Sequence, residues 1–121
     1  MSIVDTDKVD MIGIPKDNTD LVRLGITDHL CWNDDILEHL YLLQEKINSY
    51  IRFIESKEVY EAFPESKGIN NFLIEIFFLH EIPSECIEFL EKVKDILVTI
   101  NTSLRYEVDN EQVPVLDWDH P

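Results

Sequence analysis

Basic residues are scarce in this sequence of 121 residues: Lys and Arg number 10 against 25 Asp and Glu, and the formal net charge is −15. Nucleic acids and anionic membrane surfaces attract positive charge, so this balance argues against both as partners. Long apolar runs are absent too, since the longest ones fall far short of the roughly 20 residues that cross a bilayer. The acidic amino-terminal residues do not resemble a signal peptide. We therefore expect a cytoplasmic protein that binds neither nucleic acid nor membrane.

Glycine and proline are also rare, with three and five residues, whereas 45% of the residues are apolar. This composition excludes a disordered chain and is sufficient for a single hydrophobic core. The two cysteines, Cys31 and Cys86, form neither a CxxC pair nor a disulfide framework, which predicts reduced thiols. We expect one α+β domain over residues 1–108, followed by an acidic tail over 109–121.

Hydrophobic periodicity predicts strands and helices in the order β-β-α-β-α-β. Short alternating runs indicate strands, and apolar residues that recur every three or four positions indicate amphipathic helices. The elements are expected at residues 8–14, 20–27, 34–56, 71–80, 85–100 and 102–108. The first two strands flank turn-forming residues and predict a β-hairpin. The whole pattern predicts a two-layer α+β sandwich, in which a four-stranded mixed sheet carries two helices on one face.

The first predicted helix has the clearest signals. Asp35 and Glu38 have the spacing of a capping box at its start. Its predicted apolar stripe comprises Ile36, Leu40, Leu43, Ile47, Tyr50 and Ile54, and Leu37 and Ile51 are expected to widen it. Lys46 is expected on a polar face. Residues 57–70 read as a long loop with room for one helical turn, and Asn101 is expected to end the second helix in a left-handed turn.

Three segments resemble a known family. These are Lys8–Ile14 (KVDMIGI), Asp28–Trp32 (DHLCW) and Leu42–Asn48 (LLQEKIN). Together they are similar to a family of small bacterial proteins of unknown function. The resemblance implies a compact bacterial domain and no particular activity.

Residues with chemical potential are present, but their spacing matches no established site. The histidines are His29, His39, His80 and His120. No second cysteine pair and no HExxH motif accompanies them, so we predict no metal and no cofactor. Cys31 follows His29 by two residues, an unfavourable geometry for a catalytic pair in an extended segment. No catalytic residue is predicted, and the sequence favours a protein that is not an enzyme.

Acidic clusters with embedded aromatic residues are the remaining signal. An acidic surface accelerates association with basic partners, and aromatic side chains supply binding energy. The predicted partner-binding residues are Trp32, Asp34, Asp35, Glu38 and Trp118. Two other interpretations stay open: the acids serve only solubility, and Trp32 packs structurally beside the first helix.

Three functions compete at this point. The first is a small acidic cytosolic domain that binds a basic protein, such as an immunity-type inhibitor of a basic enzyme or toxin. The second is a small enzyme or metal-dependent hydrolase that uses the Asp28–Trp32 segment. The third is a structural or regulatory module that forms a homodimer through the face or edge of its sheet.

Overall fold

The computed structural model describes residues 3–33 and 35–109. Its elements are β1 (Met11–Gly13), β2 (Leu21–Asp28), α1 (Ile36–Glu55), α2 (Glu58–Ala62), the 3₁₀ turn η1 (Pro64–Ser66), β3 (Asn71–Phe78), α3 (Ser84–Val98) and β4 (Thr102–Val108). The strands form one mixed sheet in the order β1-β2-β3-β4. The pair β1 and β2 is antiparallel, as expected of the hairpin, and the other two pairs are parallel.

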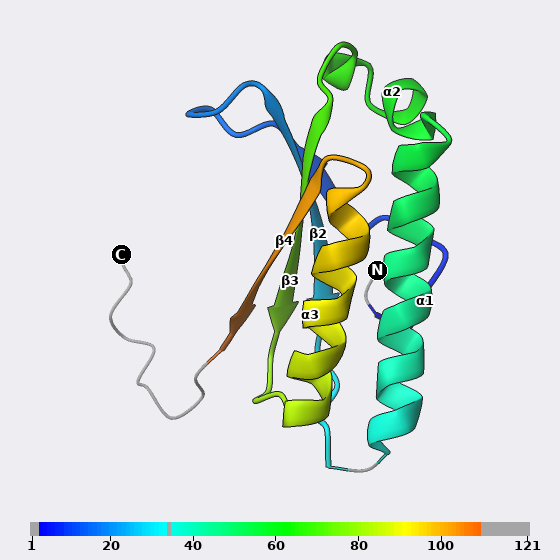
Figure 1. Ribbon diagram of the computed structural model, residues 1–121, viewed down its shortest axis with the longest axis vertical. Coiled ribbons are helices and arrows are strands. Elements are labelled where there is room, and N and C mark those ends of the chain that lie inside the picture. The colour runs from blue at the N-terminus through cyan, green and yellow to red at the C-terminus, as the bar shows by residue number, and fades with distance from the viewer. Residues whose placement is uncertain (1–2, 34, 110–121) are drawn as a thin grey trace.

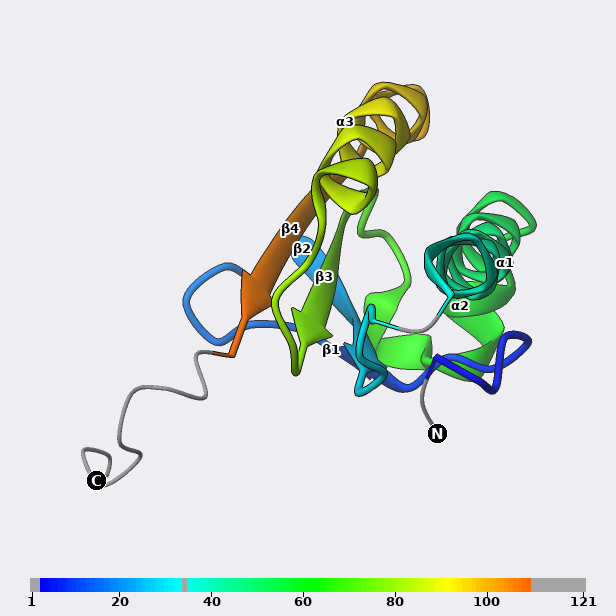
Figure 2. The same ribbon diagram turned by 90° about the horizontal axis from the view of Figure 1, so that it is seen from below.

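Both long helices cover the same face of the sheet (Figures 1 and 2). The chain moves in one direction across the sheet as it passes from β2 through α1 to β3, and from β3 through α3 to β4. Crossovers between parallel strands are almost always right-handed, so two steps in one direction put both helices on one side. The predicted α+β sandwich is therefore confirmed.

The hydrophobic core lies between the helices and one face of the sheet. Paired residues on neighbouring strands share a face, and Leu24, Ile74 and Leu104 stand side by side on the covered one. All three are buried. The helices add Leu43 and Leu90, which are fully buried. Every second side chain of the strands thus packs against the apolar side of the helices, whose residues recur with a period of 3.6.

α1 begins as predicted, but its buried face is rotated at the amino-terminal end. The Asp35 carboxylate caps the helix by accepting a hydrogen bond from the Glu38 N–H at 3.0 Å. The fully buried positions are His39, Leu43, Lys46, Ile47, Tyr50 and Ile54. Ile36 and Leu40 are only half-buried. Ile36 and Leu40 still pack against the core, but the expected stripe omitted His39, which is buried there.

Lys46 is also a correction, because it is fully buried rather than on a polar face. Its ammonium Nζ donates to the carbonyl oxygens of Asp5 and Lys8 and to Oδ1 of Asp10, each at 2.7 Å. An ammonium group has three N–H donors, so these acceptors satisfy all of them. Lys46 therefore fastens the segment 3–10 to the inner side of α1.

Tyr50 makes a second attachment one turn later. Its hydroxyl donates to the carbonyl oxygen of Gly25 at 2.5 Å and accepts from the backbone N–H of Asp10 at 2.7 Å. Burial raises the pKa of this hydroxyl well above its usual value, so it stays protonated and remains a donor. Ile3, at the start of the described chain, is fully buried. The amino-terminal segment is thus part of the core layer.

The segment 57–70 contains more regular structure than a loop. α2 packs against the end of α1, and Val59 is fully buried. Lys57 makes the turn into α2 with a left-handed φ of 67°. Asn101 has φ 56°, which confirms the predicted left-handed turn after α3.

Candidate partner-binding site

The candidate site lies where the three parallel strands end. β2, β3 and β4 finish at Asp28, Phe78 and Val108, and α1 starts beside the same edge (Figure 1). The predicted residues Trp32 and Asp35 belong to the connection from β2 into α1, and Glu38 lies in the first turn of α1.

A buried carboxylate and imidazole form the floor of the site. Asp28 is 1% exposed, and its Oδ1 accepts a hydrogen bond from the Leu30 N–H at 3.1 Å. Its Oδ2 lies 2.6 Å from Nε2 of His39 in α1. An ionised carboxylate can only accept, so Nε2 carries the proton in this pair. The contact joins the end of β2 to the second turn of α1 and orients the imidazole ring.

Trp32 stacks on this imidazole and belongs to the core. The Trp32 and His39 rings are nearly parallel, at an interplanar angle of 11° and with centroids 3.5 Å apart. Trp32 is 6% exposed and also contacts Phe78 at the end of β3. The position of Trp32 therefore supports a structural role, in which it packs beside the first helix.

Two buried nitrogens of this stack have no hydrogen-bond partner among the described residues: Nδ1 of His39 and Nε1 of Trp32. Asp28 and His39 together have the composition of the acid–base pair of a hydrolase. A general base must reach the proton that it removes, however, and Nδ1 of His39 is buried. The nearby Cys86 is fully buried, and burial followed by the charge of Asp28 raises the pKa of its thiol to about 12. It is therefore a neutral thiol and not a nucleophile.

A hollow of about 430 Å³ opens above this floor. Its lining residues are His29, Leu30, Cys31, Asp35, Glu38, His39, Leu42 and His80. Asp35 and Glu38 are exposed, and their carboxylates give the hollow a negative side where α1 begins. Carboxylates also suit the amino-terminal turn of a helix, because its dipole is positive there.

Two large apolar side chains project from α1 next to these acids. Leu37 is 78% exposed and Tyr41 is 57% exposed. Their spacing of four residues puts them on one face of the helix. We call Asp35, Leu37, Glu38 and Tyr41 the acidic rim. The sequence analysis expected Leu37 to widen the apolar stripe, which is wrong because the side chain is exposed. It assigned no role to Tyr41, although the steps of four and three residues that define the stripe leave this tyrosine outside it.

The family match covers the whole of this architecture. The model of DUF6572, a family of unknown function, matches residues 1–110. The chain belongs to DUF6572. All the helices and strands described above lie within the match, and the resemblance to a family of unknown function is confirmed. No curated protein and no solved structure matches the chain.

The predicted partner-binding residues of the DUF6572 chain divide into three groups. Asp35 and Glu38 lie together on the acidic rim, whereas Trp32 lies beneath it. Asp34 and Trp118 fall outside the described residues. Across residues 3–33 and 35–109, no three His, Cys, Asp or Glu side chains converge closely enough to hold a metal ion. The helices of this described part are also too short or too polar to cross a membrane.

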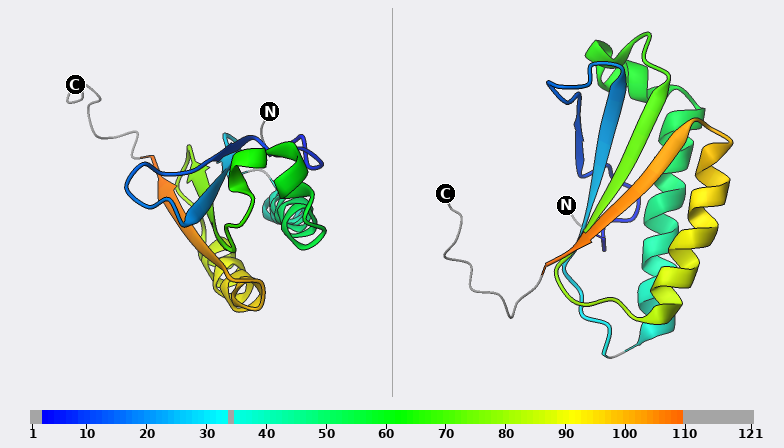
Figure 3. Two further views of the ribbon diagram at one scale, coloured as in Figure 1. Left: turned by 90° about the horizontal axis from the view of Figure 1, so that it is seen from above. Right: turned by 60° about the vertical axis from the view of Figure 1, so that its left-hand side comes forward.

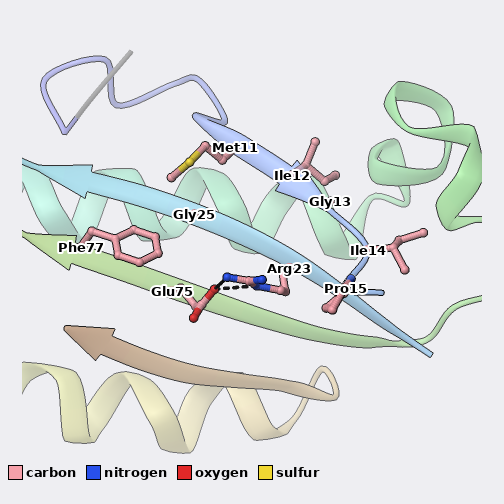
Figure 4. A pocket seen from close by; sticks show the side chains of 9 residues that line it. All are labelled: Met11, Ile12, Gly13, Ile14, Pro15, Arg23, Gly25, Glu75 and Phe77. Carbon is pink, nitrogen blue, oxygen red and sulfur yellow. Dashed lines mark hydrogen bonds and ion pairs between the residues drawn. The ribbon is translucent and has the colours of Figure 1, made fainter. Parts of the chain in front are cut away.

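The opposite face of the sheet carries a second, shallower hollow of about 230 Å³ (Figure 4). At its centre Glu75 accepts a hydrogen bond from Nε of Arg23 at 2.7 Å and another from Nη2 of Arg105. Burial alone would raise the pKa of Glu75, but the hydrogen bonds and charges of Arg105 and Arg23 outweigh it and lower the pKa. Glu75 is thus a buried anion that bridges β2, β3 and β4.

The rest of this hollow in the DUF6572 fold is apolar. Met11 and Phe77 lie at one end of it, with the ion pair between them and Pro15 (Figure 4). Met11 lies so close to Gly25 that a Cβ at this glycine would come within 2.5 Å of the methionine methyl carbon. Neither Asp35 nor Glu38 lines this hollow.

Proposed function

We propose that this DUF6572 chain is a binding domain for a basic protein, and that the partner docks on the acidic rim with a lysine or arginine side chain in the hollow beside Asp35 and Glu38. In its specific form, the proposal is an immunity-type inhibitor that holds a basic enzyme or toxin in the bacterial cytoplasm. The acidic rim would then cover or distort the active site of that enzyme.

The observation that carries the proposal is the pairing of exposed apolar area with acids at the mouth of a hollow. Exposed Tyr41 is the kind of anchor that supplies binding energy, because tyrosine is enriched in binding hot spots, and Leu37 adds exposed apolar area next to it. Glu38 is three residues from Tyr41 and lies beside it on α1, so a partner that covers Tyr41 also meets a carboxylate. The net charge of −15 extends this attraction over the whole molecule.

The floor of the hollow supports the proposal in a second way, because it is rigid. His39 lines the hollow and is only 3% exposed. The Asp28 contact and the Trp32 stack hold the ring in place before binding, which reduces the entropy lost on association.

The enzyme interpretation of the Asp28–Trp32 segment has less support. Its imidazole is covered by Trp32, and the buried Cys86 keeps its proton. Exposed Cys31 also lines the hollow, but Nδ1 of His39, the nitrogen left to act as a base beside the Asp28 contact at Nε2, is buried. These features favour a rigid binding surface over turnover.

A defined basic probe tests where binding occurs. We expect titration with an oligo-arginine peptide to shift the NMR amide signals of residues 35–41 most strongly, because two carboxylates and the helix start lie there. Added salt should weaken the effect, because exposed charges are screened beyond about 8–10 Å at physiological ionic strength. Shifts spread evenly over all acidic segments would contradict a localised site.

Matched variants then test the acidic rim against the natural partner captured from the source cells. Asp35→Asn with Glu38→Gln removes two charges and keeps a good helix cap, and each exposed ion pair contributes about 0.2–1 kcal/mol. The double variant should slow association. Tyr41→Ala should speed dissociation and cost about 2 kcal/mol or more if Tyr41 is a hot spot.

The controls remove equivalent groups elsewhere. Glu61→Gln removes an exposed helix acid on α2, and Ile96→Ala removes a side chain of 56% exposure on α3, close to the 57% of Tyr41. Both should leave the kinetics unchanged. A partner whose binding responds equally to controls and test variants, or to neither, would refute the acidic rim as the binding surface.

A further inference from the structure

β4 forms one edge of the sheet and is regular along its full length. It pairs with β3 at seven consecutive positions, from Thr102 beside Phe72 to Val108 beside Phe78. Within residues 3–33 and 35–109, no strand pairs with its other side, which Figure 3 shows at the outside of the molecule. Natural edge strands are usually protected by proline, lysine, bulges or short length, because an open edge pairs with other chains. β4 contains no proline and no lysine.

Two hydrogen bonds tell which backbone groups of β4 are free. The carbonyl oxygen of Asn101 accepts from the N–H of Phe72, and the N–H of Asp109 donates to the carbonyl oxygen of Phe78. The backbone groups of these two odd-numbered residues therefore point toward β3. The backbone N–H and C=O groups of successive residues in a strand point to opposite sides. The N–H and C=O groups of Leu104, Tyr106 and Val108 consequently face the open edge.

We propose that this edge binds a second copy of the chain, with the two β4 strands antiparallel around a two-fold axis at Tyr106. Closed two-fold dimers are the commonest oligomers, and their interfaces must be self-complementary. An axis at Tyr106 puts Arg105 opposite Glu107 of the second copy, and this pair occurs twice. An axis at Arg105 would instead oppose two guanidinium groups. The charge pattern of β4 thus favours an axis at Tyr106 over one at Arg105.

The backbone agrees with this register. Tyr106 of each copy would exchange its free N–H and C=O with Tyr106 of the other, and Leu104 would do the same with Val108. Arg105 and Glu107 then occupy a non-hydrogen-bonded pair, where opposing Cα atoms are only about 4.5 Å apart and side chains are closest. The Arg105 side chain is 58% exposed, and one of its nitrogens already contacts Glu75. A guanidinium has five N–H donors, so others remain for Glu107.

The outer flank of α3 has the same self-complementarity. Phe89 and Ile96 line the groove between α3 and α1, so the opposite flank faces the open edge of the sheet. That flank presents Ile87, 41% exposed, and Val98, 69% exposed. Between them lie Glu91 and Lys94, which form an ion pair of 3.0 Å. Two antiparallel α3 helices would place Ile87 near Val98 and Glu91 near Lys94.

The mass of the full-length protein in solution tests the pairing directly. We expect sedimentation to give a monomer–dimer equilibrium, and amide exchange at Leu104, Tyr106 and Val108 to slow as the protein concentration rises. Exchange at Ser103, Arg105 and Glu107 should be slow at every concentration, because those amides already bond to β3. A monomer at all concentrations, or a dimer whose even-numbered β4 amides stay fast, would overturn the proposal.

A charge reversal provides the matched comparison. Glu107→Arg puts a guanidinium opposite Arg105 in both pairs of the dimer, which should weaken association by about tenfold. Glu61→Arg changes the net charge by the same amount on α2, outside the proposed interface, and should leave the dimer unchanged or stronger through lower overall repulsion. Equal weakening by both variants would refute this register. Glu107 is exposed, so circular dichroism of both variants should match the parent protein.

Discussion

Replacing Lys46 by methionine should remove a large part of the stability of this domain. The Lys46 side chain is fully buried, and its partner Asp10 has a side-chain exposure of 2%. Without the ammonium group, the Asp10 carboxylate stays buried with no opposite charge, and two carbonyl oxygens lose their donor. Breaking a buried ion pair from one side costs about 3–5 kcal/mol. Small domains have only about 5–15 kcal/mol in total.

Urea unfolding followed by circular dichroism measures this loss. With a slope of about 1–3 kcal/mol per molar urea, the midpoint of Lys46→Met should fall by about 1 M or more. Trypsin gives a local readout, because Lys8 lies in the segment that Lys46 holds. Cleavage after Lys8 should accelerate more than cleavage after Lys94, which is exposed on α3.

The double variant Asp10→Asn with Lys46→Met separates the charge from the packing. Asparagine keeps an oxygen that can accept from the Thr27 N–H, as Oδ2 of Asp10 does. Because no charge is then left unpaired, this variant should recover about 2 kcal/mol relative to Lys46→Met. A loss below about 1 kcal/mol in the single variant, the worth of an ordinary hydrogen bond, would refute the reasoning. So would a double variant that is no more stable than the single one.

Two further predictions concern protons. The lowered pKa of Glu75 means that its ion pairs stabilise the fold at pH values above the ordinary 4.5 and are lost as the pH falls through the lower folded-state value. Glu75→Gln should therefore cost about 1–2 kcal/mol near pH 7 and progressively less in acid, as urea midpoints across this range would reveal; a constant difference would contradict it. For the thiols, a disulfide reagent should modify exposed Cys31 in the native protein and buried Cys86 only after unfolding. Loss of the native reaction in Cys31→Ser is the check, and rapid reaction of both thiols would be inconsistent with the burial of Cys86.

Local patterns predicted most of the fold. The strand and helix order, the Asp35 cap and the left-handed Asn101 each depend on residues within a few positions of one another. β1 is shorter than the predicted 8–14, because Lys8 and Asp10 turn their polar groups toward α1 instead of continuing along β2. The position of that boundary depends on a helix that begins 25 residues later.

The site was less predictable for the same reason. A lysine within an amphipathic helix usually faces water, and nothing near Lys46 in the sequence shows that residues 3–10 cross over it. His39 enters the core because Asp28 supplies a carboxylate and Trp32 supplies a ring, both from the preceding segment. Asp35 and Glu38 could be selected from the sequence as candidate site residues. The burial of Trp32 and the exposure of Tyr41 could not, because both depend on how distant segments pack.

The parallel pairing of β2, β3 and β4 has a consequence for how the chain assembles. Fifty residues separate Leu21 from its β3 partner Asn71, and thirty separate Phe72 from its β4 partner Thr102. Loop-closure entropy grows only with the logarithm of length, so the longer closure costs about 0.5 kcal/mol more, which is less than thermal energy. Neither closure is therefore strongly preferred as the first event. Because both are long-range, folding is slow relative to a helical bundle of this size, and the helices can form before the strands that they join have met.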